Sequence, residues 1–295
     1  MDFLKKYAYS PDEAYVAGRL QDILSNAGEA SPEVLKKCFS FMDLTSLHPE
    51  DTAGSVRNLV GKVNALEREY PDYPLPASVC VFPNFASVVR DARKSPALHV
   101  TVVAACFPAS QSFLEVKVRE AEMAVADGAD EVDIVLALNS FFAGDCGAAS
   151  REITAIRQAV DKVAAGKGRN VVLKVILETG VLRTFSNIAN ASFLAMEAGA
   201  DFIKTSTGKV SVNATPEAAL VMCECIRAFY AATGRAVGFK AAGGISDARE
   251  ALSYYSIGTE VLGGEWMNKE HFRFGVSRLG NSLMSAIEGK TVRYF

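Results

Sequence analysis

Four charged residues interrupt short apolar runs of this sequence, and their types indicate chemistry. Asp133 lies in the run 131–135, Lys174 in 171–176, Lys204 in 202–205 and Lys240 in 237–240. If each run is a buried strand, the alternation of side chains turns all four charges to the same side, into the interior of a barrel. Burying an ammonium group is costly unless it is paired or its pKa shifts. The pattern therefore predicts an interior site that uses amine and carboxylate chemistry.

The same charges could form a structural network of ion pairs with no catalytic role. Three lysines and one aspartate leave an excess of positive charge, and Asp43, at the end of a further apolar run, could pair with one of the lysines. Three lysines on consecutive strands nevertheless favour a functional site, because perturbed ionisable groups cluster at such sites.

Histidine and cysteine argue against a metal centre. The three histidines, His48, His99 and His271, have no ligand spacing, and none of the six cysteines forms a C-x-x-C pair. Metal-dependent aldolases and hydrolases normally need a cluster of histidines and carboxylates. The sequence also has no G-x-G-x-x-G motif for a dinucleotide. We therefore expect no metal and no cofactor.

Glycine-rich segments after the last two lysine-bearing regions predict a phosphate site. The segment 205–209 resembles a nucleotide-binding loop only in part, since Ile203 and Val210 replace its first Gly and its Ser or Thr. The segments 242–245 and 274–278 follow the seventh and eighth expected strands, where glycine amides and helix N-termini commonly bind phosphate in barrels. The candidate phosphate-binding residues are Thr207, Gly208, Lys209, Gly243, Gly244, Gly275 and Ser277.

The sequence predicts alternating strands and helices, which would position these residues. The expected strands are 41–44, 79–82, 100–107, 131–138, 171–177, 202–205, 236–240 and 272–275. They are continuous apolar runs, as in parallel sheets that helices cover, and helical periodicity follows at 115–126 and 216–230. Eight such units predict the α/β fold class and a single (β/α)8 TIM barrel over residues 41–295.

Residues 1–40 read as additional helices packed on the barrel. Ser10 is expected as an N-cap with Pro11 in the first turn and Glu13 completing a capping box. Ser31 is expected as the N-cap of a second helix, and Gly28 is expected to end the first helix. We expect these helices to make a subunit contact, and we expect the protein to form a homodimer.

Composition limits the classes of protein that fit. The 295 residues carry a formal net charge of −3, and 49% of them are hydrophobic. A near-neutral chain lacks the basic footprint of nucleic-acid binding, and no run reaches the ~18 apolar residues of a membrane span. We expect a cytoplasmic protein that binds neither nucleic acid nor membrane.

Six ordered motifs resemble the deoxyribose-phosphate aldolase family over residues 40–285. They are FMDLT at 41–45, ADEVD at 129–133, LKVILETG at 173–180, ADFIKTSTGK at 200–209, VNATP at 212–216 and GFKAAGG at 238–244. The resemblance implies a class I aldolase on a TIM barrel. Such an enzyme reversibly cleaves 2-deoxy-D-ribose 5-phosphate to acetaldehyde and D-glyceraldehyde 3-phosphate, without a metal.

The resemblance also implies a role for each charged residue. Lys204 matches the lysine that forms the Schiff base, Lys240 the second lysine and Asp133 the carboxylate that moves protons, while Asp43 and Lys174 match supporting charges. Elementary chemistry agrees, because an ammonium beside a lysine disfavours its protonation and makes it more nucleophilic. The expected partners are therefore a small phosphorylated sugar and aldehydes.

The chain departs from the family pattern at a few positions. Ala241 and Ser246 stand where the family often has Pro and Arg, and Arg278 replaces a second Ser of the last loop. Arginine can bind phosphate in a bidentate manner. Tyr294 near the end of the chain is a candidate to reach the site, as some family members use a terminal tyrosine, and Cys80 is expected inside the barrel as a packing residue.

Two other functions compete with this one. Another lysine-dependent barrel aldolase could act on a different short phosphorylated sugar, since a barrel does not specify its substrate. A sugar-phosphate-binding protein without catalysis would need phosphate contacts but no lysine pair. The ordered motifs and the retained lysines favour the deoxyribose-phosphate aldolase.

Overall fold

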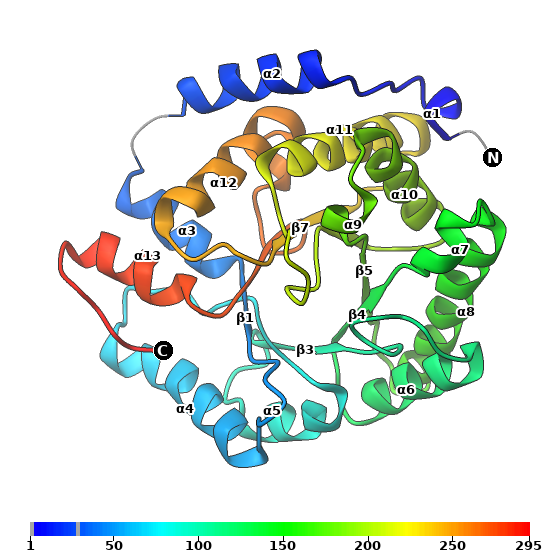
Figure 1. The fold of residues 1–295 in the computed structure, drawn as a ribbon. Coiled ribbons are helices and arrows are strands. Elements are labelled where there is room, and N and C mark those ends of the chain that lie inside the picture. Colours follow the sequence, from blue (N-terminus) through cyan, green and yellow to red (C-terminus); the bar gives the residue numbers. More distant parts are fainter. Residues whose placement is uncertain (1–2, 28–29) are drawn as a thin grey trace.

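The computed structural model describes residues 3–27 and 30–295, whose strands close into a parallel barrel. In chain order each strand pairs with the next, and β8 pairs with β1. The strands are β1 (Met42–Thr45), β2 (Ser78–Val81), β3 (His99–Val103), β4 (Glu131–Val135), β5 (Val172–Ile176), β6 (Phe202–Lys204), β7 (Gly238–Ala242) and β8 (Phe272–Val276). The predicted TIM barrel is confirmed, and Figure 1 shows it with the helices around the strands.

Helices connect the strands and form the outer layer. They are α1 (Phe3–Lys6), α2 (Glu13–Ser25), α3 (Pro32–Ser40), α4 (Ala53–Glu69), α5 (Ala86–Ala92), α6 (Leu114–Ala126), α7 (Leu138–Phe142), α8 (Cys146–Ala165), α9 (Thr179–Leu182), α10 (Phe185–Glu197), α11 (Pro216–Thr233), α12 (Ala248–Leu262) and α13 (Leu279–Glu288). Short 3-10 helices occur at Pro83–Phe85 and Gly264–Trp266. The outward strand residues and the inward helix faces bury one continuous apolar core between the two layers.

Two predicted strands extend three or four residues beyond the observed ones. β3 ends at Val103 rather than at 107, because Ala105 and Cys106 have φ values of +57° and +63°, outside the extended conformation. β4 ends at Val135 rather than at 138, and α7 begins at Leu138. The apolar runs continue past the strands because the first loop residues are also buried at the end of the barrel.

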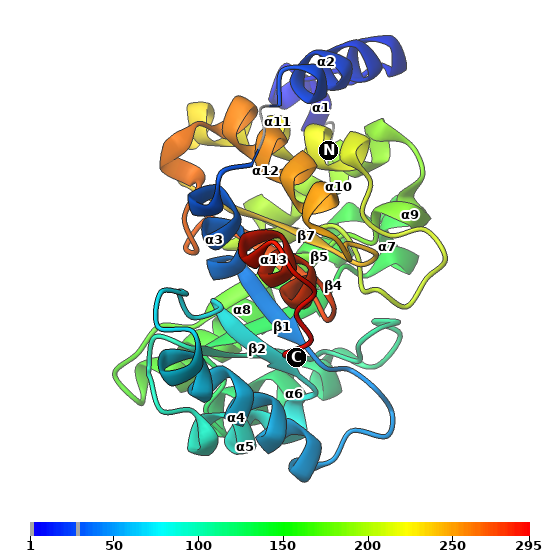
Figure 2. The ribbon, with the colours of Figure 1, turned by 90° about the vertical axis from the view of Figure 1, so that its left-hand side faces the viewer.

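The N-terminal helices lie outside the barrel: α1 and α2 lie over α10, α11 and α12, and α3 packs on α12 and α13 (Figures 1 and 2). The predicted cap at Ser10 with Pro11 in the first turn is wrong: α2 begins at Glu13, and the carboxylate of Asp12 accepts the Tyr15 N–H at 2.8 Å. The charged Asp12 is a good N-cap, so the helix starts two residues later.

The second predicted cap is confirmed. The Ser31 hydroxyl accepts the Val34 N–H and Pro32 occupies the first turn of α3. Gly28 lies outside the described residues. The boundary at residue 40 between a helical extension and a catalytic domain stays a prediction.

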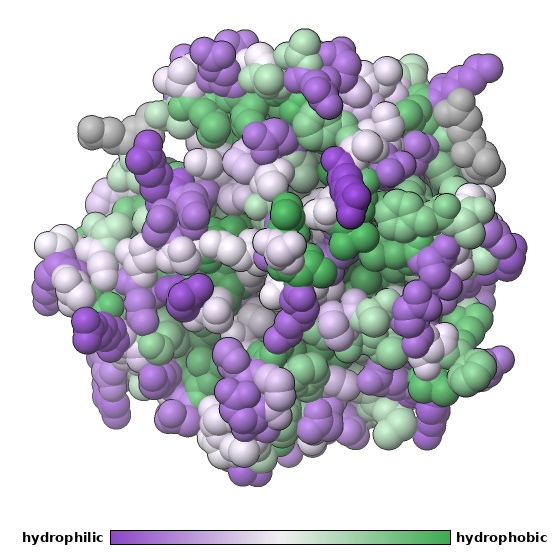
Figure 3. Space-filling view, viewed as in Figure 1, coloured by the Kyte–Doolittle hydropathy of each residue, from purple (hydrophilic) through white to green (hydrophobic). Residues whose placement is uncertain are grey.

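Hydrophilic and hydrophobic residues are interspersed over the face shown in Figure 3. Among the helices of the described residues, none combines the length and apolar character needed to cross a bilayer.

Candidate active site

A cluster of charged side chains fills the centre of the barrel. The register of the strands explains it: Asp133 on β4 is paired with Lys174 on β5, and Lys204 on β6 with Lys240 on β7. Alternation turns these side chains inward, as the sequence predicts. Asp133, Lys174 and Lys240 are fully buried, and Lys204 keeps an exposed fraction of 4%.

Asp133 is the common partner of all three lysines. Its Oδ1 accepts Lys174 Nζ at 2.8 Å, while its Oδ2 accepts Lys204 Nζ and Lys240 Nζ, each at 2.8 Å. Burial acts to raise the pKa of Asp133, but the three ammonium groups outweigh it and hold that pKa far below its usual range. Asp133 is therefore an ionised carboxylate placed among possible proton donors.

Asp43 provides the pairing that the excess of positive charge requires. Its Oδ2 accepts Lys240 Nζ in a short hydrogen bond and lies 3.6 Å from Lys174 Nζ. Its Oδ1 accepts the Ser78 hydroxyl at 2.8 Å. The predicted contact between Asp43 and a spare lysine is confirmed.

The environment separates the pKa values of the two paired lysines. Burial, assisted by the charge of Lys240 and opposed by Asp133, lowers the pKa of Lys204. Burial also acts to lower the pKa of Lys240, but Asp133 and Asp43 together raise it above its usual value. Groups that are pushed apart in this way can divide the roles of nucleophile and fixed cation.

Above the lysines, the loops after the strands enclose a cavity of about 250 Å³. Lys204 is the one lysine of the cluster that lines it. The other lining residues are Thr45, Leu47, His48, Thr207, Gly208, Lys209, Ala242, Gly243, Gly244, Ile245, Ser246, Gly275, Val276, Ser277 and Arg278. All seven candidate phosphate-binding residues are among them, so the structure brings them together beside Lys204.

Glycine backbone forms one wall of the cavity. Gly208 has a φ of +79° and both Gly243 and Gly244 have a φ of +85°, which other residues rarely adopt. A Cβ on Gly243 would also lie 2.7 Å from Asn213 side-chain atoms. Such a wall leaves room for an anion to approach backbone amides.

Side chains add charge and order to the same wall. Lys209 Nζ donates to the Leu47 carbonyl at 2.6 Å, which holds an ammonium group at the rim. Glu178 accepts both the N–H and the hydroxyl of Thr207 and so fixes the turn after β6. Arg278 and Ser246, at two of the positions where the chain departs from the family pattern, also line the cavity.

Two members of the charged cluster are not among the residues predicted from the sequence. Arg273 on β8 donates to Asp43 Oδ1 at 2.5 Å and to Glu131 Oε1 at 2.8 Å, and both Arg273 and Glu131 are buried. Each stands two residues before an inward position of its own strand, Asp133 for Glu131 and Gly275 for Arg273. The period-2 alternation that found the lysines could therefore have found them as well.

The remaining candidates lie as follows. Cys80 is buried inside the barrel and packs with Leu47 and Val103, as predicted. Tyr294 does not line the cavity: its hydroxyl donates to the Lys62 carbonyl of α4 at 2.8 Å, and its ring contacts Tyr70. The expectation that Tyr294 reaches the site is not met in this structure, because α4 holds its hydroxyl.

The histidines are separated from one another. His99 contacts Glu131, His48 lines the cavity, and His271 packs on Trp266. Within residues 3–27 and 30–295, no group of three histidine, cysteine or acidic side chains is arranged to hold a metal ion.

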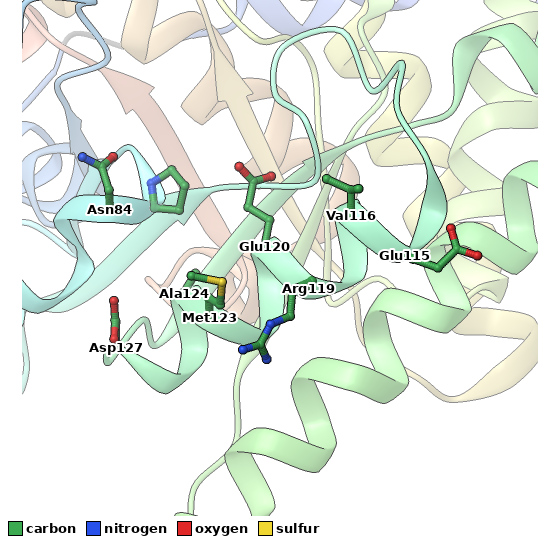
Figure 4. Close-up of a pocket in the computed structure, with 9 residues that line it drawn as sticks. Asn84, Glu115, Val116, Arg119, Glu120, Met123, Ala124 and Asp127 are labelled. Carbon is green, nitrogen blue, oxygen red and sulfur yellow. The ribbon is translucent and has the colours of Figure 1, made fainter.

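A second hollow lies on the outside of the barrel, along α6. It has a volume of about 500 Å³ and is mostly apolar, and Figure 4 shows its lining side chains from α6 and from the segment after β2. None of the charged cluster lines it. The cavity above Lys204 is therefore the candidate active site.

Comparison with known proteins finds relatives that are all described as aldolases. Residues 38–258 match the model of the DeoC/LacD family of aldolases. A human deoxyribose-phosphate aldolase is 40% identical over 264 residues, which are 86% of this chain and 79% of that protein. A Caenorhabditis elegans protein assigned as a deoxyribose-phosphate aldolase is 42% identical over 256 residues, covering 86% of this chain and 81% of its own.

A solved structure shares the fold. The tetrameric deoxyribose-phosphate aldolase of Aeropyrum pernix is 25% identical, with a TM-score of 0.65 over 94% of this chain and 98% of that one.

Proposed function

We propose that this chain reversibly cleaves 2-deoxy-D-ribose 5-phosphate to acetaldehyde and D-glyceraldehyde 3-phosphate, through a Schiff base on Lys204. The chain belongs to the DeoC/LacD family of aldolases. One observation carries the choice of nucleophile. Of the three clustered lysines, Lys204 lines the cavity, while Lys174 and Lys240 are fully buried below it.

The first half of the reaction forms the Schiff base. Neutral Lys204 attacks the C1 carbonyl of the open-chain sugar to give a carbinolamine. Loss of water, with Asp133 moving the protons, leaves an iminium ion on C1. The lowered pKa of Lys204 supports this step, because a larger fraction of the amine is neutral near pH 7.

The second half breaks the carbon–carbon bond. Removal of the C3 hydroxyl proton turns that carbon into an aldehyde, and the electrons of the C2–C3 bond move into the iminium to give an enamine. D-glyceraldehyde 3-phosphate then leaves, the enamine is protonated at C2, and water releases acetaldehyde and free Lys204. Asp133 can carry these protons since it contacts Lys204 directly.

The glycine wall and Lys209 would bind the phosphate. Residues of the turns after β6, β7 and β8 line the cavity, where their backbone amides can face an anion. Holding the phosphate there would place C1 of a short sugar over Lys204 and exclude longer chains.

The test of this proposal is an activity assay on the Lys204→Leu variant. Cleavage of 2-deoxyribose 5-phosphate should fall to background, while the melting temperature stays within a few degrees because leucine is common in buried parallel strands. A variant that keeps activity near the parent level would contradict the role of Lys204. Lys209→Leu is a useful control, since it should weaken substrate binding and leave the Schiff base intact.

The subunit contact through the N-terminal helices that the sequence predicts stays untested. We also propose a homodimer, and we place its contact on α6 and the groove beside it. Val116 and Met123 are 54% and 53% exposed, and Phe113 at the start of the helix is 78% exposed. We consider an antiparallel pair of α6 helices whose twofold axis passes between Arg119 and Glu120. Arg119 of each copy would then face Glu120 of the other. Val116 would then meet Met123, and Phe113 would enter the groove of the second copy; Figure 4 shows the residues that line this groove in one copy.

The oligomeric state tests this arrangement. Met123→Lys should convert a dimer to a monomer in sedimentation experiments, whereas an exposed change on the opposite flank, Arg249→Glu, should not. An unchanged mass for Met123→Lys would place the contact elsewhere, for instance on the N-terminal helices. The cytoplasmic location stays a prediction.

A further inference from the structure

Glu131 is a buried carboxylate below the lysines that the proposed reaction does not use. Four side chains from three other strands donate to it. Its Oε2 accepts Lys174 Nζ at 2.5 Å and the Thr101 hydroxyl at 3.0 Å, and its Oε1 accepts Arg273 Nη2 at 2.8 Å. The fourth partner is His99, whose Nδ1 lies 2.7 Å from Oε1.

His99 differs from the rest of this group by its access to solvent. It is the first residue of β3, and its side chain is 35% exposed, whereas the side chains of Glu131 and Lys174 are fully buried. It therefore closes the charged cluster at the end of the barrel opposite the cavity. Water that entered here would reach Glu131 first.

The charge on Glu131 decides which partner donates in the contact with His99. Burial acts to raise the pKa of Glu131, but Arg273 and Lys174 hold it well below its usual value. An ionised carboxylate can only accept hydrogen bonds. His99 therefore carries its proton on Nδ1 and donates it to Oε1.

A continuous set of contacts runs from this carboxylate to the reactive lysine. Lys174 Nζ bridges Glu131 Oε2 and Asp133 Oδ1, at 2.5 Å and 2.8 Å. The other oxygen of Asp133 accepts Lys204 Nζ. Rotation of the Glu131 carboxylate would therefore shift Lys174, and with it the balance of charge that Asp133 presents to Lys204.

We infer that His99 is a positioning residue for Schiff-base formation: its Nδ1–H fixes Glu131 and thereby holds Lys174, Asp133 and Lys204 in their reactive arrangement. The inference rests on the proposed function. It adds a residue that touches no substrate and lies at the far end of the barrel from the cavity.

Other charges around these groups set the background for any pH effect. Arg273 from β8 contacts Glu131, Asp43 from β1 lies 3.6 Å from Lys174 Nζ, and Lys240 from β7 shares Asp133. Near His99 itself, Lys269 Nζ donates to the Ala97 carbonyl. None of these contacts is made by the His99 ring itself.

Two substitutions separate the hydrogen bond from packing. His99→Leu keeps much of the volume and removes the donor, while His99→Asn places an amide N–H near the position of Nδ1. We expect kcat of His99→Leu to fall at least about tenfold, as for loss of a hydrogen bond to a charged group. KM for the phosphorylated sugar should not change, because the phosphate wall lies at the other end of the site.

The pH profile should move as well. When Lys174 is no longer held, Asp133 acts more fully on Lys204 and favours its protonated form, so the acidic limb of the kcat profile should shift to higher pH. His99→Asn should restore both kcat and the profile. If His99→Leu does not fold, Thr101→Val, which removes a different donor to Glu131, should give a smaller shift in the same direction.

The outcomes distinguish this inference from the proposed function. If the unaltered protein does not cleave 2-deoxyribose 5-phosphate, the proposed function fails. If it does and His99→Leu matches it in kcat and pH profile, the inference is overturned. Equal impairment of His99→Leu and His99→Asn would also overturn it, because the ring would then matter for packing alone.

Discussion

Replacing Lys240 by methionine removes one of the two ammonium groups that share Oδ2 of Asp133. Since Lys204 Nζ and Lys240 Nζ each lie 2.8 Å from that oxygen, they are at most twice 2.8 Å apart. At an effective dielectric constant of 20, two unit charges at that separation repel by about 3 kcal/mol, which corresponds to about 2 pKa units. The substitution also leaves Asp133 less neutralised, which acts in the same direction.

We therefore expect the pKa of Lys204 to rise in Lys240→Met and the rate at neutral pH to fall at least ~100-fold, as the neutral fraction of the amine falls. The assay is the pH dependence of kcat/KM for 2-deoxyribose 5-phosphate cleavage, from pH 6 to the alkaline limit of stability. Activity should recover as the pH rises toward the new pKa. Lys174→Met is the matched control, since it removes an ammonium from the other oxygen of Asp133 and should shift the profile less.

The reasoning fails if Lys240→Met loses activity equally at every pH. Such a result would mean that Lys240 donates a proton in the reaction rather than setting the charge of its neighbour. Unchanged activity at neutral pH would contradict both roles.

Two further predictions follow from the glycine wall and the buried carboxylates. Gly243→Ala should raise KM for the phosphorylated sugar about tenfold through backbone strain and the clash with Asn213, and leave the slower cleavage of unphosphorylated deoxyribose unchanged. Gly234→Ala, at a φ of +72° with open space around it, is the control for strain alone, and an equal KM effect there would refute the account. Because the pKa values of Asp43, Glu131 and Asp133 are lowered in the folded protein, their contribution to stability is complete above the unfolded carboxyl pKa of about 4 and is lost as the pH falls below it. Urea unfolding from pH 7 to pH 3 should show this loss, and Glu131→Gln should reduce its slope; a pH-independent unfolding free energy would contradict it.

Much of the fold could be predicted because parallel strands covered on both faces are continuous apolar runs. Lys174, Lys204 and Lys240 were recognisable since a charge inside such a run has to face the interior. The loops after β6, β7 and β8 were recognisable from their glycines. Strand ends were less predictable, because buried loop residues such as Ala105 are as apolar as the strand before them.

The rest depends on contacts between distant segments. Glu178 has a backbone φ of +58°, and its side chain accepts a hydrogen bond from the Thr207 hydroxyl. Neither feature can be recognised from the local sequence. Tyr294 could not be placed from its position near the chain end, because its site is decided by the Lys62 carbonyl. The alternation that marks Asp133 also turns Glu131 inward, but the contacts of Glu131 with Thr101 and Lys174 depend on the register of the neighbouring strands.

The central claim is that Lys204 forms the covalent intermediate, and borohydride trapping tests it most directly. The protein is incubated with 2-deoxyribose 5-phosphate, reduced, digested and mapped by peptide mass spectrometry. The account predicts a reduced substrate adduct on Lys204. An adduct on Lys240 would reverse the roles of the two lysines, and a folded protein that binds the sugar without any adduct would contradict Schiff-base catalysis.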